Sequence, residues 1–158
     1  MMEPSFERLL VLLVDAGIRF VVVGGIAVTL QGYVRLTEDI DVLLDGEHGN
    51  VRSFLDCLAD YGEGFARELS VEDFADEEGA IRIVEEVELC QIDVFVRMSG
   101  RSYQDVLSDA DRFVVSGRTV QVASKNSLIR WKEQSVREKD RLDAMALRRL
   151  SEDPHAFD

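Results

Sequence analysis

The chain has 158 residues, with 18 lysines and arginines against 31 aspartates and glutamates, and therefore a formal net charge of −13 at pH 7. The length is enough for one domain with a substantial core, and a hydrophobic fraction of 46% with 2 prolines excludes global disorder. The acidic balance argues against a broad electrostatic grip on nucleic acid, but it leaves room for an RNA substrate held by a local basic patch.

The first expected element is a helix that begins near Ser5 and ends at Gly17. A buried strand over 19–23 follows, because a run of apolar, β-branched residues ends abruptly at the pair Gly24-Gly25. The next residues suit a short helix that reaches 31–32. Backbone N–H groups without side-chain bulk at a helix start can bind phosphate, so we interpret the glycine pair as a phosphate site, with an ordinary tight turn as the alternative.

The second expected strand, over 39–44, carries Asp39 and Asp41. Side chains two residues apart in a strand point to the same face, so the two carboxylates should lie side by side near the glycine turn. They repel each other, and a hard divalent cation such as Mg²⁺ relieves the repulsion while keeping coordination places for phosphate oxygens. A solvated, exposed strand face is the alternative. We predict a site for Mg²⁺, or else Mn²⁺, that activates an attacking oxygen.

The middle of the chain is expected to contain a helix with Val51, Phe54 and Leu58 on its apolar face, and then an acidic, poorly periodic stretch. Within this stretch we expect a weak strand or loop over 65–69 and a solvated surface over 72–78. Strand patterns return at 80–84 and at 88–96.

Asp93 lies inside the otherwise apolar run 89–96. A carboxylate in a buried strand is costly unless it is paired, hydrogen-bonded or bound to a metal. An aspartate at a strand end that bonds nearby backbone is the structural alternative. We predict instead that Asp93 lies on a strand beside Asp39 and Asp41, where it completes the metal site or accepts the proton of the attacking hydroxyl.

The last part of the chain is expected to contain a loop over 98–102, a short helix over 103–107 and a hairpin over 113–122 with its turn at Ser116-Gly117. Ser124 is expected to cap a helix, and a charged segment then leads into a final helix that ends before Pro154. The N-terminus lacks the pattern of a signal peptide, no apolar run is long enough to span a membrane, and the two cysteines lack metal-ligand spacing. We therefore expect a cytoplasmic protein with free thiols.

The order of these motifs resembles the polymerase-beta-type nucleotidyltransferase superfamily. Gly24-Gly25-Ile26-Ala27 followed by Arg35-Leu36-Thr37-Glu38-Asp39-Ile40-Asp41 is similar to the small bacterial "minimal" enzymes of that superfamily. The tail, Leu128-Ile129-x-x-Lys132 and then Arg137-x-Lys139-Asp140-x-x-Asp143, resembles the C-terminal helical signature of AbiEii-like nucleotidyltransferases of toxin–antitoxin systems. The resemblance covers most of the chain, from about residue 18 to about residue 150.

The resemblance implies an α/β (α+β) fold, in which a mixed β-sheet is flanked by helices and the C-terminus is helical. It implies transfer of a nucleoside monophosphate from an NTP such as ATP to an acceptor hydroxyl, with release of pyrophosphate. Gly24 and Gly25 would then bind the triphosphate, Asp39 and Asp41 would hold Mg²⁺, and Asp93 would serve the acceptor side as ligand or base. The remaining expected nucleotide-binding residues are Arg35, Thr37, Lys132 and Lys139.

We expect a single nucleotidyltransferase domain over 1–158, with a core over about 18–123 and C-terminal helices over about 124–150. The expected partners are an NTP and an acceptor that is an RNA, a protein or a small molecule, with a cognate antitoxin or partner chain as a further candidate. The alternative function is a catalytically inactive nucleotide-binding or toxin–antitoxin interaction protein of the same fold. The presence of all three acids favours the enzyme. A structural Ca²⁺ site ranks last because the chain lacks the oxygen-rich loop that such a site needs.

Overall fold

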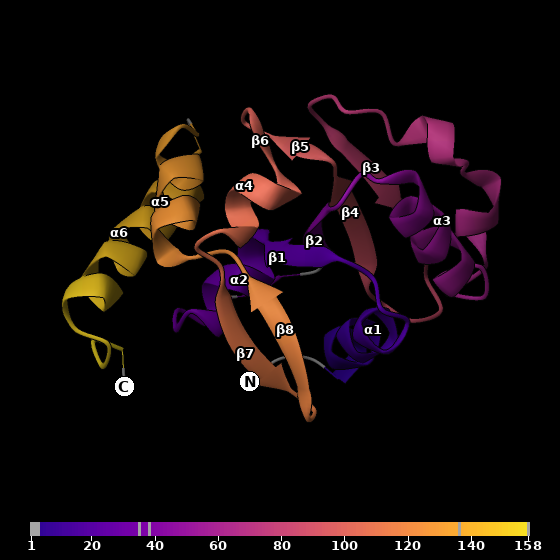
Figure 1. Ribbon diagram of the computed structural model, residues 1–158. Coiled ribbons are helices and arrows are strands. Elements are labelled where there is room, and N and C mark those ends of the chain that lie inside the picture. The colour runs from indigo at the N-terminus through magenta and orange to yellow at the C-terminus, as the bar shows by residue number, and fades with distance from the viewer. Residues whose placement is uncertain (1–3, 35, 38, 136, 158) are drawn as a thin grey trace.

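The computed structural model describes residues 4–34, 36–37, 39–135 and 137–157. A six-stranded mixed sheet lies at its centre, with the strand order β3-β4-β2-β1-β8-β7. Helices cover the sheet, so the predicted fold class, a mixed β-sheet flanked by helices with a helical C-terminus, is confirmed (Figure 1). The strands of this sheet are β1 (Phe20–Val23), β2 (Asp39–Leu44), β3 (Ala80–Ile83), β4 (Gln91–Phe95), β7 (Asp111–Val115) and β8 (Arg118–Val122).

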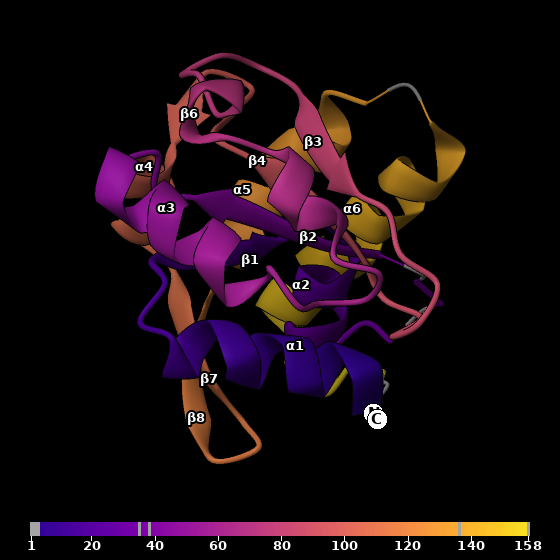
Figure 2. The same ribbon diagram turned by 90° about the vertical axis from the view of Figure 1, so that its right-hand side faces the viewer.

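The helices lie on both sides of the sheet. Figures 1 and 2 place α1 and α3 on one side and the C-terminal pair α5 and α6 on the other. No helix in the described ranges is both long enough and apolar enough to cross a bilayer. The α-helices are α1 (Pro4–Asp15), α2 (Gly24–Leu30), α3 (His48–Cys57), α4 (Tyr103–Leu107), α5 (Lys125–Glu133) and α6 (Glu138–Glu152).

The strand directions bring three chain segments together at one end of the central strands. Strand β2 runs antiparallel to β1 and parallel to β4, and β4 runs antiparallel to β3. The end of β1 therefore meets the beginning of β2 and of β4, and Val23 lies opposite Asp41 in the register. Since α2 starts directly after β1, its first turn lies at this same end of the strands.

The alternation of side chains along β2 decides which of its residues enter the core. Ile40 and Val42 are fully buried, whereas Asp39 and Asp41 lie half-buried on the other face. This is the period of two that an extended strand imposes. The acids thus share the face of the sheet that α5 approaches, while Ile40 and Val42 anchor the strand from the opposite face.

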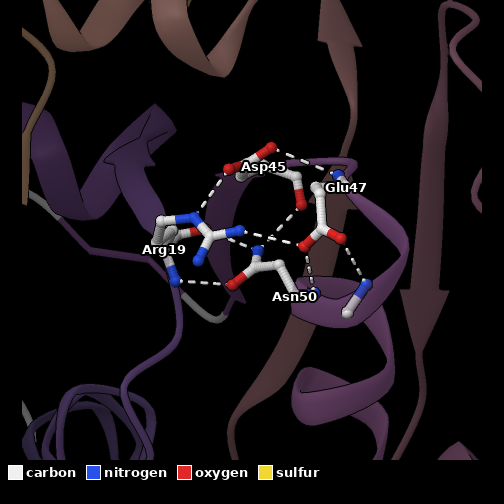
Figure 3. A network of polar contacts seen from close by, with 5 residues as sticks. Arg19, Asp45, Glu47 and Asn50 are labelled. Carbon is white, nitrogen blue, oxygen red and sulfur yellow. Dashed lines mark hydrogen bonds and ion pairs between the residues drawn. The ribbon is translucent and has the colours of Figure 1, made fainter.

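The far ends of β1 and β2 are tied together by a polar network around Asn50 (Figure 3). Its side-chain amide donates to the carbonyls of Arg19 and Asp45 at 3.0 and 2.8 Å, and its oxygen accepts from the Arg19 backbone N–H at 2.9 Å. The Arg19 guanidinium donates to Asp45 at 2.7 Å and to Glu47 at 3.1 Å. Glu47 also caps α3 by accepting from two backbone N–H groups of its first turn.

Two of the expected strand segments differ from the structure. Within 65–69, four residues form a 3₁₀ helix, η1 (Phe65–Glu68), which follows Gly64 in a left-handed conformation, φ +85°. Residues 88–90 form a loop instead of the beginning of β4. The buried carboxylate of Glu85 accepts the backbone N–H groups of Glu88 and Cys90, both at 2.5 Å, and Leu89 has a positive φ of 57°, which interrupts a strand.

The expected loop over 98–102 is a small hairpin, made of β5 (Arg97–Met98) and β6 (Arg101–Ser102). Its turn residues have φ values of +50° at Ser99 and +78° at Gly100, and the predicted turn at Ser116-Gly117 has the same pattern, +49° and +78°. Left-handed turns of this kind suit the twist of a two-residue hairpin.

The acidic stretch expected as a solvated surface is exposed, but it is not free of contacts. It contains a second 3₁₀ helix, η2 (Val71–Asp73). Asp76 pairs with Arg97 at 2.8 Å, and Glu78 accepts the backbone N–H groups of the hairpin turn at 2.7 and 2.8 Å. The acids thus anchor the β5–β6 hairpin.

Candidate active site

A row of charged side chains crosses three neighbouring strands, at the end of the sheet where β1 finishes and α2 begins. Arg82 of β3 lies opposite Asp93 of β4, which in turn lies opposite Asp41 of β2. Asp39 lies two residues before Asp41 on the same face of β2. The structure therefore brings together the three acids that were predicted from the sequence. Asp41 and Asp93 lie on neighbouring strands although they are 52 residues apart in the chain.

Asp41 is the member of this row that is least compatible with a charge in its present surroundings. Burial foremost, and then the neighbouring charges of Asp93 and Asp39, raise the pKa of its carboxyl from 3.8 to about 7, while the charge of Lys132 acts in the opposite direction. A buried carboxyl next to two others favours the neutral form until a cation is supplied. The acid row is therefore a place where a further positive charge would be stabilising.

Gly24 and Asp41 are in direct contact. Gly24 has a φ of +66°, and a Cβ atom on it would lie 1.9 Å from the Asp41 Oδ2 atom, far inside any van der Waals contact. A side chain at this position is therefore excluded both by backbone conformation and by space. Gly25 follows in the first turn of α2 and is buried, and Val23 before the helix supplies no side-chain cap. The backbone at the start of α2 thus lies against the acid row.

Arg82 bonds two of the three acids. Its Nε and Nη2 atoms donate to the two oxygens of Asp93, both at 2.8 Å, and Nη2 also donates to Asp39 Oδ2 at 3.0 Å. The hydrogen bond with Asp93 and the charges of Asp93 and Asp39 raise the pKa of the guanidinium above its usual range. Sequence reasoning did not select Arg82. Its position between two isoleucines in β3 indicates the exposed face, but the register with β4 is not readable from the sequence.

The C-terminal helices contribute a second charged cluster, centred on Lys132. Its ammonium group donates to Asp140 at 2.8 Å and lies 3.1 Å from Asp143 Oδ2, and both aspartates are buried. Asp140 also accepts from Ser135 and Arg137. Burial by itself would raise the pKa of Asp140, but the hydrogen bonds from Lys132, Ser135 and Arg137 outweigh it and hold that pKa below its usual range.

The acid row and the Lys132 cluster face a common cavity of about 620 Å³. Trp131 also lines it, with the Arg101 guanidinium 5.5 Å from the centre of its ring. Thr37 is at its rim and donates to the Asp39 carbonyl at 3.1 Å. Arg35 falls outside the described residues. The other residues expected at the site all line this cavity: Gly24, Gly25, Thr37, Asp39, Asp41, Asp93, Lys132 and Lys139.

A second cavity of about 670 Å³ lies on the other side of the Asp39–Arg82 pair. It shares Thr37, Asp39 and Arg82 with the first cavity, so these residues form the wall between the two. Its remaining lining comes from the start of α1, from the loop 85–89 and from the first residue of β4. This loop includes the exposed apolar side chains of Val87 and Leu89.

The donor set suits a divalent cation that is shared with a substrate. Among the described residues, no group of three or more His, Cys, Asp and Glu side chains is arranged as a ready metal cage. Mg²⁺ does not require such a cage, because it binds through one or two carboxylates together with phosphate oxygens and water. Asp39 and Asp41 supply such a pair on one face of β2, and a cation there would offset the burial and the neighbouring charges that raise the pKa of Asp41.

Comparisons with known proteins agree on one kind of fold. A family model described as nucleotidyl transferase of unknown function (DUF2204) matches residues 4–155. The lincomycin-bound lincosamide antibiotic adenylyltransferase LnuA aligns with a TM-score of 0.64 at 16% identity, covering 94% of this chain and 97% of that one. An antigenic nucleotidyltransferase-like protein from Paracoccidioides brasiliensis aligns with a TM-score of 0.53 at 17% identity, covering 89% and 72%. At these identities the likeness concerns the fold. No curated protein matches the sequence.

Proposed function

The chain belongs to this family of nucleotidyl transferases, and from that premise we propose that it moves a nucleoside monophosphate from an NTP to an acceptor hydroxyl, releasing pyrophosphate. The observation that carries the proposal is the row of Asp41, Asp93 and Asp39 in one cavity, with Gly24 in contact with Asp41. Carboxylates at this density serve no purpose in a stable core, but they suit a reaction in which phosphate and metal charges must be balanced.

In the proposed mechanism, Asp39 and Asp41 would hold Mg²⁺, with Mn²⁺ as the alternative, and a cation bound there would supply charge stabilisation for the leaving pyrophosphate. Asp93, on the neighbouring strand, accepts the proton of the attacking hydroxyl or joins the metal ligands. The backbone N–H groups of Gly24 and Gly25 bind the triphosphate at the start of α2.

The positively charged side of the cavity completes the nucleotide site. Lys132 is held in place by Asp140 and Asp143, so its ammonium group is a fixed charge and not a mobile one. Lys139, on the exposed first turn of α6, is free to approach phosphate as a flexible point charge. We assign Lys132 to orienting the site and Lys139 to phosphate contact, with Thr37 and, from its place in the sequence alone, Arg35 as further nucleotide-binding residues.

A small molecule is the acceptor class that we favour over RNA or protein. The second cavity adjoins Asp39, and its 670 Å³ fall within the size range of small-molecule sites. The net charge of −13 opposes the binding of a polyanion such as tRNA. The similar structure LnuA is named as an adenylyltransferase of lincosamide antibiotics, which supports a small acceptor. A toxin that modifies tRNA or protein, controlled by an antitoxin, is the competing role.

The experiment that tests this proposal separates reaction from acceptor. Purified protein, Mg²⁺ and each α-labelled NTP are incubated with three fractions of a cell lysate: small molecules, total tRNA and proteins. We expect label in the small-molecule fraction, and none with Asp41→Ala. Label on tRNA or protein would overturn the acceptor class and favour the toxin role. No label in any fraction would overturn nucleotidyl transfer and leave a nucleotide-binding or interaction protein.

A further inference from the structure

Arg82 differs from Arg97 and Arg118, which each pair with a single aspartate on the surface. Arg97 pairs with Asp76, and Arg118 pairs with Asp15 through two bonds of 3.1 Å. Arg82 instead bridges two carboxylates that come from two different strands, whereas the two acids bonded by Arg19 lie in the loop after β2. Arg82 is carried by β3, the edge strand of the sheet, and its side chain is 49% exposed. It is thus a cation within the acid row that has room to move.

The three bonds of Arg82 are unequal in what they connect. Nε bonds Asp93 and no other acid, whereas Nη2 divides its donation between Asp93 and Asp39. The contact with Asp39 is the longer one, 3.0 Å against 2.8 Å, and Asp39 is the more exposed of the two acids, 31% against 14%. A small rotation of the side chain would give up Asp39 and keep Asp93.

Asp39 cannot bind the Arg82 guanidinium and a divalent cation at full strength at the same time. The Asp39 Oδ2 atom accepts a hydrogen bond from Arg82 Nη2, and the carboxylates of Asp39 and Asp41 both line the cavity. A guanidinium next to this oxygen repels a second cation and occupies one of its lone pairs.

We propose that Arg82 is an exchangeable counter-ion of the acid row. It bonds Asp39 and Asp93 together when no divalent cation is present, and it releases Asp39, while keeping Asp93, when Asp39 and Asp41 bind one. This inference rests on the assignment of Asp39 and Asp41 as metal ligands in the proposed function. Arg82 and the divalent cation then compete for Asp39. The guanidinium stabilises the acid row when no metal is bound, and it lowers the affinity of the site for the metal.

Binding of Mn²⁺ without nucleotide tests the exchange directly. The variants are Arg82→Gln and, as the matched control, Arg118→Gln, which removes an exposed arginine with two bonds to one aspartate. Free Mn²⁺ is followed by electron paramagnetic resonance during titration. We expect Arg82→Gln to bind Mn²⁺ about three- to tenfold more tightly than the unmodified protein, and Arg118→Gln to bind it equally. Unchanged or weaker binding by Arg82→Gln would overturn the proposal.

Thermal unfolding distinguishes an exchangeable partner from a permanent structural one. In chelator, Arg82→Gln should unfold at a lower temperature because three carboxylates then repel without their guanidinium. At saturating Mn²⁺ this deficit should disappear, since the metal replaces the lost charge. A deficit of equal size with and without Mn²⁺ contradicts the exchange. Arg82→Lys, which keeps the charge but cannot bridge two carboxylates in the same way, should fall between the two in both measurements.

These measurements need no acceptor and no turnover. If transfer is never detected but Arg82→Gln tightens Mn²⁺ binding, the proposed reaction fails and the exchange stands. If transfer is detected but Mn²⁺ affinity is independent of Arg82, the exchange fails and the reaction stands.

Discussion

The two ends of strand β2 both carry aspartates, but the surroundings of these acids are opposite in kind. At the far end, Asp45 accepts from the Arg19 guanidinium at 2.7 Å and from the Glu47 backbone N–H at 3.2 Å (Figure 3). Glu47 is likewise satisfied by Arg19 and by the first turn of α3. At the near end, Asp39, Asp41 and Asp93 share the guanidinium of Arg82, which bonds two of them.

The difference teaches how to separate structural acids from functional ones. An acid with enough donors contributes to folding and needs nothing else. Within the acid row, burial and the neighbouring acids raise the pKa of Asp41, and a ligand that brings positive charge would stabilise its ionised form. The Lys132 cluster belongs with the first kind, because Asp140 has three donors, although it borders the same cavity as the second kind.

The largest expected effect comes from the same substitution at both ends of β2. Asp41→Asn should lower the rate of nucleotidyl transfer by about 10³-fold or more, equivalent to about 4 kcal/mol, because it removes a proposed metal ligand. Asp45→Asn should leave the rate near its original value and lower stability by about 1–2 kcal/mol, since it weakens the bond with Arg19. Initial rates with labelled NTP and urea unfolding measure the two effects. Loss of transfer in Asp45→Asn with normal folding would contradict the division between the ends.

A smaller effect is expected from breaking the far network at its centre. Asn50 is buried and bonds three backbone groups, two of Arg19 just before β1 and one of Asp45 just after β2. Asn50→Ala should cost about 2–3 kcal/mol of unfolding free energy, because it leaves buried backbone groups without partners. Asn126 is exposed on α5, so Asn126→Ala is the control and should change stability by less than about 0.5 kcal/mol. Urea unfolding measures both. Equal losses of unfolding free energy in the two variants would show that the Asn50 network does not stabilise the end of the sheet where β1 begins and β2 ends.

The smallest expected effect is a pH dependence from Asp41. Its folded pKa of about 7 lies above the ordinary 3.8, so the folded state holds this proton more tightly than the unfolded state. The stabilisation is complete below the ordinary pKa and is lost as the pH rises through the folded one. In chelator, the unmodified protein should therefore lose about 1–2 kcal/mol relative to Asp41→Asn between about pH 5 and about pH 8. Parallel stability curves for the two proteins would refute the raised pKa.

Local patterns predicted much of this molecule. The β-branched run before Gly24-Gly25 predicted β1 and the start of α2, and Asp39–Leu44 forms the strand β2 over its expected range. The cap at Ser124 and the turn at Ser116-Gly117 also depend only on neighbouring residues, and both are present. These features are set within a few residues of the chain, where propensity and side-chain period act directly.

Other features depend on contacts between distant residues, and the sequence did not predict them. The pairing of Arg82 with Asp93 requires the register of β3 on β4, and one residue of slip would turn Arg82 to the other face. The loop before β4 depends on Glu85, a buried carboxylate whose backbone partners lie three and five residues further on. The roles of the site residues stay predictions, because position in a cavity does not by itself establish chemistry.

The strand order has a consequence for how the chain acquires its shape. Strand β1 is near the beginning of the chain, but its outer neighbour is β8, and the pair Val22 and Val122 is 100 residues apart. During synthesis, β1, β2, β3 and β4 can associate while the outer edge of β1 is still open. An open edge of this kind invites pairing with other chains, and contacts of such long range slow the final closure. The acid row can therefore assemble before this side of the sheet is protected, and the β7–β8 hairpin then covers the open edge of β1.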